Sequence, residues 1–129
     1  MAFKATFFVN EKQYNVKKYH YSGTQPTDAS NKPMARPIQG YVDMTVEAND
    51  DEFLYHWFTE PEVTHDGMVV FHNSDRTSAT RKLQFKQGFC VDYDEDFSDE
   101  GSNPMTIDVS ITAGEIDING IKDKKFWGK

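Results

Sequence analysis

Apolar and polar residues alternate along most of this chain, and that alternation is the pattern of β-strands with one buried face. The cleanest example lies at residues 38–46, where apolar side chains or glycine occupy every even position. The same period opens the chain at residues 3–9. Further segments with strand character occur at residues 14–21, 68–72, 82–86, 89–93, 106–112 and 115–118. We therefore predict about eight short strands, with a hairpin or turn signal at Asn119-Gly120.

One segment after residue 48 has the helical period instead. Its apolar residues recur at positions i, i+1, i+4 and i+5 and form a single stripe: Phe53, Leu54, Trp57 and Phe58. Asn49 or Asp50 can cap this helix, and Pro61 ends it. We predict one helix at about residues 50–59, with its apolar stripe plugging a sheet or barrel rather than binding a cofactor.

The composition supports a mainly β fold. The chain has only 2 Leu, against 9 Val, 6 Ile and 18 aromatic residues, and this bias favours pleated sheet. At 129 residues, with no internal repeat or linker, residues 1–129 form a single domain. We predict an antiparallel β-barrel with one helix and a thin apolar core.

Charge is spread unevenly along the chain. Residues 1–40 have a net charge of +4 and residues 41–129 a net charge of −11, which together give −7. Such a chain can stack on copies of itself, positive face to negative face, unless the folded sheet interleaves the two halves. Basic residues are few and are not interleaved with aromatic ones, so nucleic-acid binding is not expected.

The chain also lacks the signals of membrane insertion or signal-peptide export. No apolar run approaches the ~20 residues that span a bilayer, so we predict no membrane insertion. The first nine residues lack the apolar region and cleavage site of a signal peptide. We therefore expect the chain to be made in the cytoplasm.

No pattern of catalytic or metal-binding residues stands out. The four His residues form no close ligand pair. The acidic run that starts at Asp92 departs from a calcium loop, since Phe97 replaces the required Gly and Asn103 the required Glu. Cys90 lies in an apolar strand context and is expected to be buried. We predict no enzyme activity, no cofactor and no metal.

The order and spacing of many short matches resemble one known family. They begin with Phe3-Lys4-Ala5 and continue through a proline-bearing loop, the capped helix and Asp66-Gly67. The most specific segment is residues 102–106, Ser-Asn-Pro-Met-Thr, before an alternating strand. Nearly end to end, the chain is similar to the haemolysin-coregulated protein family (Hcp, TssD), the tube protein of type VI secretion systems.

The resemblance implies a β-barrel subunit that forms homohexameric rings. In the family, rings stack into a tube inside a contractile sheath, tipped by a spike protein, and the lumen can carry effector proteins. It implies that this chain is exported to the extracellular space or a target cell without a signal peptide.

The resemblance also suggests which residues join one ring to the next. The segment from Ser22 to Gln39 is long for a connection inside a compact domain and holds three prolines. In the family this loop reaches the neighbouring ring, which implies stacking contacts from Gln25, Pro26, Asp28, Lys32, Pro33, Met34, Arg36 and Pro37. On charge alone, the acidic partner surface would be Asp92, Asp94, Glu95, Asp96, Asp99 and Glu100.

A monomeric small-ligand-binding β-barrel is the alternative. Its cavity would be lined by some of the 18 aromatic residues. The stripe from Phe53 to Phe58 argues against it, because the helix is expected to fill the barrel.

Overall fold

The computed structural model describes residues 3–24, 39–49, 51–73, 81–100, 105–119 and 121–124. The proposed stacking-loop residues, from Gln25 to Pro37, lie outside these ranges. The elements in chain order are β1 (Phe3–Val9), β2 (Lys12–Thr24), β3 (Gln39–Glu47), α1 (Phe53–Thr59), β4 (His65–Asn73), β5 (Arg81–Phe97), β6 (Met105–Ile118) and β7 (Ile121–Lys124).

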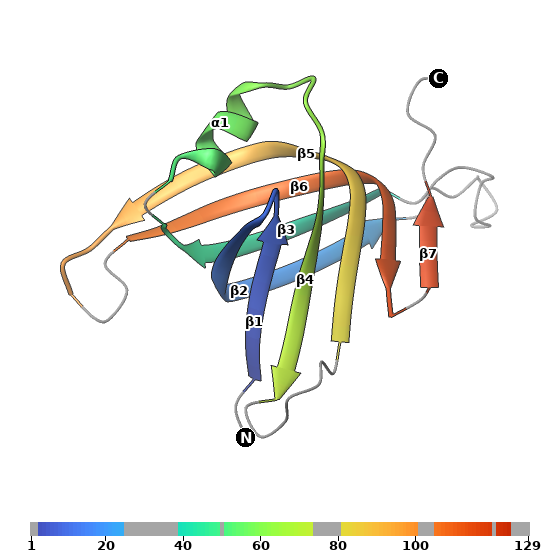
Figure 1. The fold of residues 1–129 in the computed structure, drawn as a ribbon, viewed down its shortest axis with the longest axis horizontal. Helices are drawn as coiled ribbons and strands as arrows, with labels where there is room; N and C mark the ends of the chain where they lie inside the picture. Colours follow the sequence, from blue (N-terminus) through green and yellow to red (C-terminus); the bar gives the residue numbers. More distant parts are fainter. Residues whose placement is uncertain are drawn as a thin grey trace.

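The described strands form one antiparallel barrel (Figure 1). They are hydrogen-bonded in the order β3-β2-β1-β4-β5-β6-β7, and an additional pairing of β3 with β6 closes the first six into a barrel. β7 pairs with the last residues of β6 through the turn at Asn119, whose φ of 50° is typical of such a turn. The predicted fold class, an antiparallel barrel with a single helix, is confirmed.

The strands differ from the prediction in how they are divided. Residues 82–86 and 89–93 belong to one strand, β5, and residues 106–112 and 115–118 belong to one strand, β6. Near Gln87, which has a φ of 57°, β5 interrupts its alternation without leaving the sheet, and a second irregularity separates Cys90 from Asp92. Bulges of this kind bend a strand and reset its faces, so an interrupted sequence period does not end the strand.

The barrel interior is filled by the inward-facing residues of the alternating pattern. Both leucines of the chain, Leu54 and Leu83, are buried there. Aromatic rings supply much of the remaining volume, with ring centroids 6.2 Å apart for Phe7 and Phe85 and 6.4 Å apart for Trp57 and Phe85. Because these three rings pack on one another, they act as part of the core.

Two glycines make room for the ring at the centre of this core. A Cβ atom on Gly67 would lie 2.4 Å from Phe85 Cζ, and one on Gly88 would lie 2.6 Å from Phe85 Cε1. Side chains cannot approach this closely, so the Phe85 ring occupies space that only glycine leaves open on β4 and β5.

The helix plugs the barrel as predicted, but it begins later than predicted. α1 starts at Phe53, and the neighbouring Asp51 side chain accepts a hydrogen bond from the Phe53 N–H at 3.0 Å. Of the two predicted caps, Asn49 donates to the Gln13 carbonyl, and Asp50 lies outside the described residues. Leu54 and Trp57 are buried, Phe53 packs against the core, and Phe58 is 36% exposed at the rim. The apolar stripe therefore does fill the barrel, through three of its four members.

Candidate self-association surface

Four strands form a continuous wall on one side of the barrel, in the order β2-β3-β6-β5 (Figure 1). Along β2, the pairing with β1 ends at Val16, and along β5, the pairing with β4 ends at Gly88. Beyond these points, no described strand pairs with residues 17–24 of β2 on the side away from β3. The same holds for residues 89–97 of β5 on the side away from β6. We call these two segments the β2 edge and the β5 edge.

A register shift lies close to the start of each edge. The β2–β3 register shifts between Val16 and Lys18, at the point where β2 leaves β1. The β5–β6 register shifts between Cys90 and Asp92, shortly after β5 leaves β4. A strand edge that is not covered by a neighbouring strand can pair with another chain.

The outer face of the wall is polar, because residues directly opposite one another in neighbouring strands share a face. One row across all four strands contains His20, Asp43, Ser110 and Asp92. The next row contains Lys18, Thr45, Asp108 and Asp94. In the middle of the wall, the Ser110 hydroxyl donates to Asp43, and the Thr45 hydroxyl donates to Asp108.

The two edges differ in side-chain chemistry on this face, with basic residues on one and acidic residues on the other. Lys18 and His20 are exposed on the β2 edge, whereas Asp92, Asp94 and Asp96 are exposed on the β5 edge. Among the described residues, no ion pair engages any of these five side chains. The inner faces of both edges carry half-buried aromatic residues, which include Tyr19 and Tyr93.

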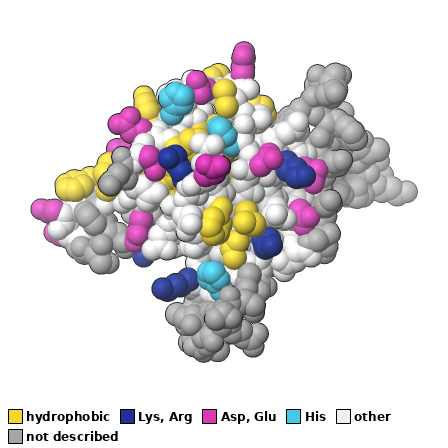
Figure 2. Space-filling view, viewed as in Figure 1, with side chains coloured by type: hydrophobic (Ala, Val, Ile, Leu, Met, Phe, Trp, Pro, Cys, Tyr) yellow, Lys and Arg dark blue, Asp and Glu magenta, His cyan; other side chains and the backbone are white. Residues whose placement is uncertain are grey.

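Apolar side chains are exposed on the β5 edge itself. Val91, at the register shift, is 46% exposed, and Phe97 at the end of β5 is 72% exposed. Figure 2 shows hydrophobic side chains gathered where the β5–β6 hairpin projects from the barrel. A groove of about 340 Å³ runs along the start of the edge, lined by Phe58, Glu60, Pro61, Phe89, Cys90, Val91 and Thr112.

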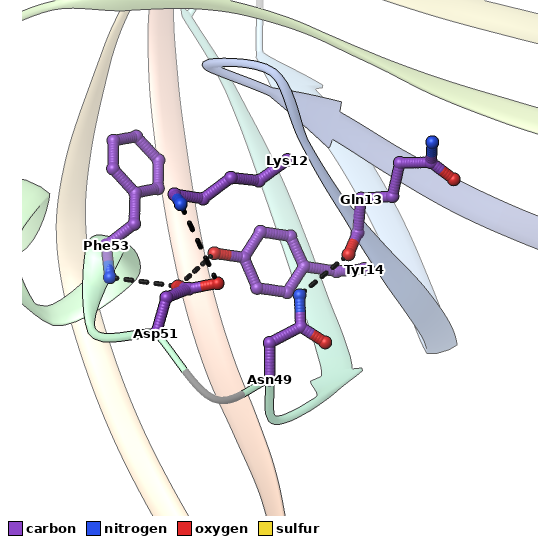
Figure 3. Close-up of polar contacts among 6 residues, drawn as sticks. All are labelled: Lys12, Gln13, Tyr14, Asn49, Asp51 and Phe53. Carbon is purple, nitrogen blue, oxygen red and sulfur yellow. Dashed lines mark hydrogen bonds and ion pairs between the residues drawn. The ribbon is translucent and has the colours of Figure 1, made fainter.

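A polar cluster holds the start of α1 against the β1–β2 hairpin (Figure 3). The buried Tyr14 hydroxyl donates to Asp51 Oδ1 at 2.9 Å, and Lys12 Nζ lies 4.0 Å from Asp51 Oδ2. The Asn49 side-chain amide donates to the Gln13 carbonyl at 2.8 Å. Further along α1, the rings of Tyr55 and Phe58 contact Tyr93 of β5. The polar cluster and these ring contacts together hold the helix beside the β5 edge.

The pKa of Asp51 is lowered by these contacts. Partial burial alone raises the pKa, because it disfavours the charged carboxylate. The hydrogen bonds from the Phe53 N–H and the Tyr14 hydroxyl, with the nearby Lys12 ammonium, outweigh that effect. Asp51 is therefore a charged acceptor in the folded protein.

The predicted acidic surface is split by the strand. Asp92, Asp94 and Asp96 lie on the outer face of the wall, but Glu95 lies on the opposite face, where it accepts a hydrogen bond from Tyr93 at 2.6 Å. Asp99 and Glu100 are exposed beyond the end of β5. Whether these residues meet the stacking loop stays a prediction.

Lys18 and His20 are the site residues that sequence reasoning missed. The signal for them was weak: the consecutive lysines at positions 17 and 18 break the alternation of the strand where it bulges. Lys17 itself is held at 3.5 Å from Glu47.

Cys90 is buried, as predicted. Burial raises the pKa of its thiol to about 12, so the reactive thiolate is scarce at neutral pH.

Among the residues that the structure describes, no cluster of three or more His, Cys, Asp or Glu side chains is arranged to hold a metal ion. No helix in the described ranges has the length and apolarity to cross a membrane.

Fold and surface together define a small closed β-barrel whose distinctive chemistry lies at sheet edges. The model of one family, hemolysin coregulated protein Hcp (TssD), matches residues 1–128, and the chain belongs to that family. It is therefore a structural tube protein of type VI secretion. A comparison with curated protein sequences finds no significant match.

Solved structures agree with this assignment. Hcp1 from Flavobacterium johnsoniae is 28% identical, with a TM-score of 0.83 over 95% of this chain and 99% of that chain. Hcp1 from Salmonella typhimurium shares the fold at 8% identity, with a TM-score of 0.74 over 93% of this chain and 88% of that chain. The chain also matches the fold of a chain in a sheath-tube complex of an extracellular contractile injection system. The identity is 10% and the TM-score 0.59, over 91% of this chain and 88% of that chain.

Proposed function

We propose that this chain, as a single domain, is the ring-forming subunit of a type VI secretion inner tube. Six copies close into a ring, and rings stack into a tube that is expelled from the cell and can carry effectors in its lumen. The observation that carries this proposal is the wall with two different edges, the β2 edge and the β5 edge, each paired on one side only among the described strands.

Two different edges on one subunit are what a closed ring requires. In a cyclic assembly each copy uses one surface toward the preceding neighbour and another toward the next. Pairing the β2 edge of one copy with the β5 edge of the next leaves no edge open once the ring closes. Ring formation also explains the thin core, because part of the apolar burial is then supplied between copies.

The role is structural, and it needs neither catalysis nor a cofactor. The partners are further copies of this chain, the sheath and spike proteins of the secretion system, and effector proteins. The sheath-tube complex of the injection system supports this reading, because its fold matches most of this chain. Nucleic acid is not a partner, since carboxylates outnumber basic groups on the outer face of the wall.

Light scattering after size-exclusion chromatography tests the ring. We expect a species with the mass of six chains, in equilibrium with single chains as the protein is diluted. A mass of one chain at every concentration would contradict the proposal.

The stacking loop is tested separately from the ring. Reversing the charges of Lys32 and Arg36 to Glu is expected to abolish ring stacking while leaving single rings intact. Because exposed charges are screened by salt, wild-type stacking is expected to weaken between about 0.1 and 1 M salt. Stacks that form unchanged in the reversed variant would show that these two residues do not join rings.

A further inference from the structure

A pocket of about 350 Å³ lies between the start of α1 and the β5–β6 hairpin. Its apolar lining comes from Tyr55 on the helix, Tyr93 on β5, and Met105 and Ile107 on β6. Tyr55 is 53% exposed and Met105 is 37% exposed, so both present apolar surface to the solvent. Phe97, which is 72% exposed, pairs with Met105 across the hairpin and extends this surface. The pocket therefore has room and apolar area for a large side chain of a partner.

The charged side chains of the pocket all have the same sign. Those that line it among the described residues are the carboxylates of Asp51, Glu52 and Glu95. Asp51 is already engaged by the Tyr14 hydroxyl and by the nearby Lys12 ammonium. Glu52 and Glu95 are exposed, and no ion pair within the described part of the chain engages either of them. The pocket therefore favours a partner that carries an apolar group next to positive charges.

The segment that follows β7 has this chemistry. Residues 125–129 read Lys-Phe-Trp-Gly-Lys, so two adjacent aromatic residues stand between two lysines. These residues lie outside the described ranges, and β7 ends just before them at Lys124. Tryptophan is a frequent anchor of protein interfaces, and it suits an apolar pocket with an acidic rim when lysines flank it.

This segment cannot enter the pocket of its own chain. β7 pairs with β6 as far as Glu115, whereas the pocket lies at the start of β6. Figure 1 shows α1 and the start of β6 toward one end of the molecule and β7 toward the other. The stretch of β6 from Ile107 to Glu115 spans roughly 26 Å, whereas Trp127 follows Lys124 by at most roughly 11 Å of extended chain. Trp127 therefore reaches such a pocket only on a second copy.

From these observations we propose that residues 125–129 of one copy dock in this pocket of a second copy, with Trp127 on the apolar lining and the flanking lysines at Glu52 and Glu95. The inference rests on the proposed self-assembly and adds a contact to it. Because the pocket and β7 lie at opposite ends of the subunit, copies that stack in the same direction bring the segment of one to the pocket of the next. The segment thus joins copies of successive rings rather than copies within one ring.

A labelled peptide tests the contact in solution. The probe is fluorescein-labelled Lys-Lys-Phe-Trp-Gly-Lys, the sequence of residues 124–129, and the receptor is the full chain with Trp127→Ala, whose own segment lacks the anchor. Fluorescence anisotropy is expected to show saturable binding, which is lost when alanine replaces tryptophan in the peptide. Both titrations use the same folded receptor. No saturable binding, or equal binding of the two peptides, would overturn the proposal.

Charge reversal in the receptor locates the site. Glu52→Lys with Glu95→Lys is expected to weaken peptide binding at least about tenfold, since two attractive contacts become repulsive. The matched control is Glu11→Lys with Glu62→Lys, which makes the same change of charge at exposed positions outside the pocket. Its binding is expected to stay within about twofold, because salt screens distant charges. Circular dichroism establishes that each receptor is folded. Equal weakening in the two receptors would assign the binding to net charge and overturn the pocket.

A disulfide cross-link tests whether the contact joins two copies. One protein carries Gly128→Cys and a mass tag, and the other carries Glu52→Cys. The native Cys90 is buried and does not compete for oxidation. When the two proteins are mixed at low concentration, concentrated and oxidised, we expect a covalent dimer with one chain of each kind. Oxidation that yields no such mixed dimer would overturn the docking between copies.

Light scattering separates this contact from the proposed function. Trp127→Ala is expected to keep the species with the mass of six chains, because the segment joins successive rings. Six-chain wild-type protein whose pocket binds no peptide would overturn the docking and leave the proposed function standing. Wild-type protein with the mass of one chain at every concentration would overturn the proposed function, whereas saturable peptide binding in that case would still support the pocket.

Discussion

Replacing Trp57 with alanine is expected to lower the free energy of unfolding by about 3–5 kcal/mol. The Trp57 side chain is 1% exposed, and its ring packs against Phe53, His65 and Phe85. Removing it leaves a cavity between the helix and the barrel, which a chain with only 2 leucines has few large aliphatic side chains to refill. Urea denaturation at one fixed protein concentration measures the loss, because assembly adds concentration-dependent stability.

Trp57→Phe is the matched control. The indole Nε1 is buried without a hydrogen-bond partner among the described protein atoms, so the smaller ring removes an unsatisfied donor along with some volume. We expect a loss well below that of the alanine variant. Equal losses in the two variants would show that ring packing at this position is not what holds the helix in the barrel.

Breaking the contact between Tyr14 and Asp51 is expected to have the second largest effect, about 1.5–3 kcal/mol for either Tyr14→Phe or Asp51→Asn. The carboxylate serves Tyr14 and the N–H of Phe53 together, so the two changes remove overlapping interactions. The double variant is therefore expected to lose less than the sum of the single ones. Lys12→Gln is the control. Because the Lys12 side chain is 36% exposed and its Nζ lies 4.0 Å from Asp51 Oδ2, the loss in this variant is expected to stay below about 1 kcal/mol.

Asp51 also gives this contact a pH dependence. A carboxyl whose pKa is lower in the folded chain stabilises the fold above its ordinary pKa of 3.8, and this contribution is lost as the pH falls through the folded value. The difference in stability between wild type and Asp51→Asn is expected to be full at neutral pH and to shrink in strong acid. A difference that is constant across this range would contradict the role assigned to the charge.

The period of the sequence was enough to predict the class of fold, because alternation reports directly which face of a strand is buried. It could not predict where long strands continue. Gln87 and Gly88 interrupt the pattern of β5, yet the strand passes through them, since bulges are set by pairing partners distant in the sequence. The start of α1 was displaced for a similar reason, because Asp51 is fixed by Tyr14, 37 residues away.

The candidate surface was predicted only in part. The acidic run on β5 is visible in the sequence as a cluster of like charges. The basic pair, Lys18 and His20, is not visible in the sequence as a site. Its position relative to Asp94 and Asp92 follows only from the strand register, which places these residues in the same rows. Which segments have a described strand on one side only is likewise a property of the closed barrel, and no local pattern of residues encodes it.

Electron microscopy of the purified, negatively stained protein tests ring formation directly. The proposed ring predicts particles with a central hole and six-fold symmetry. A field of single small particles for the wild-type protein, at concentrations where it is folded, would contradict it.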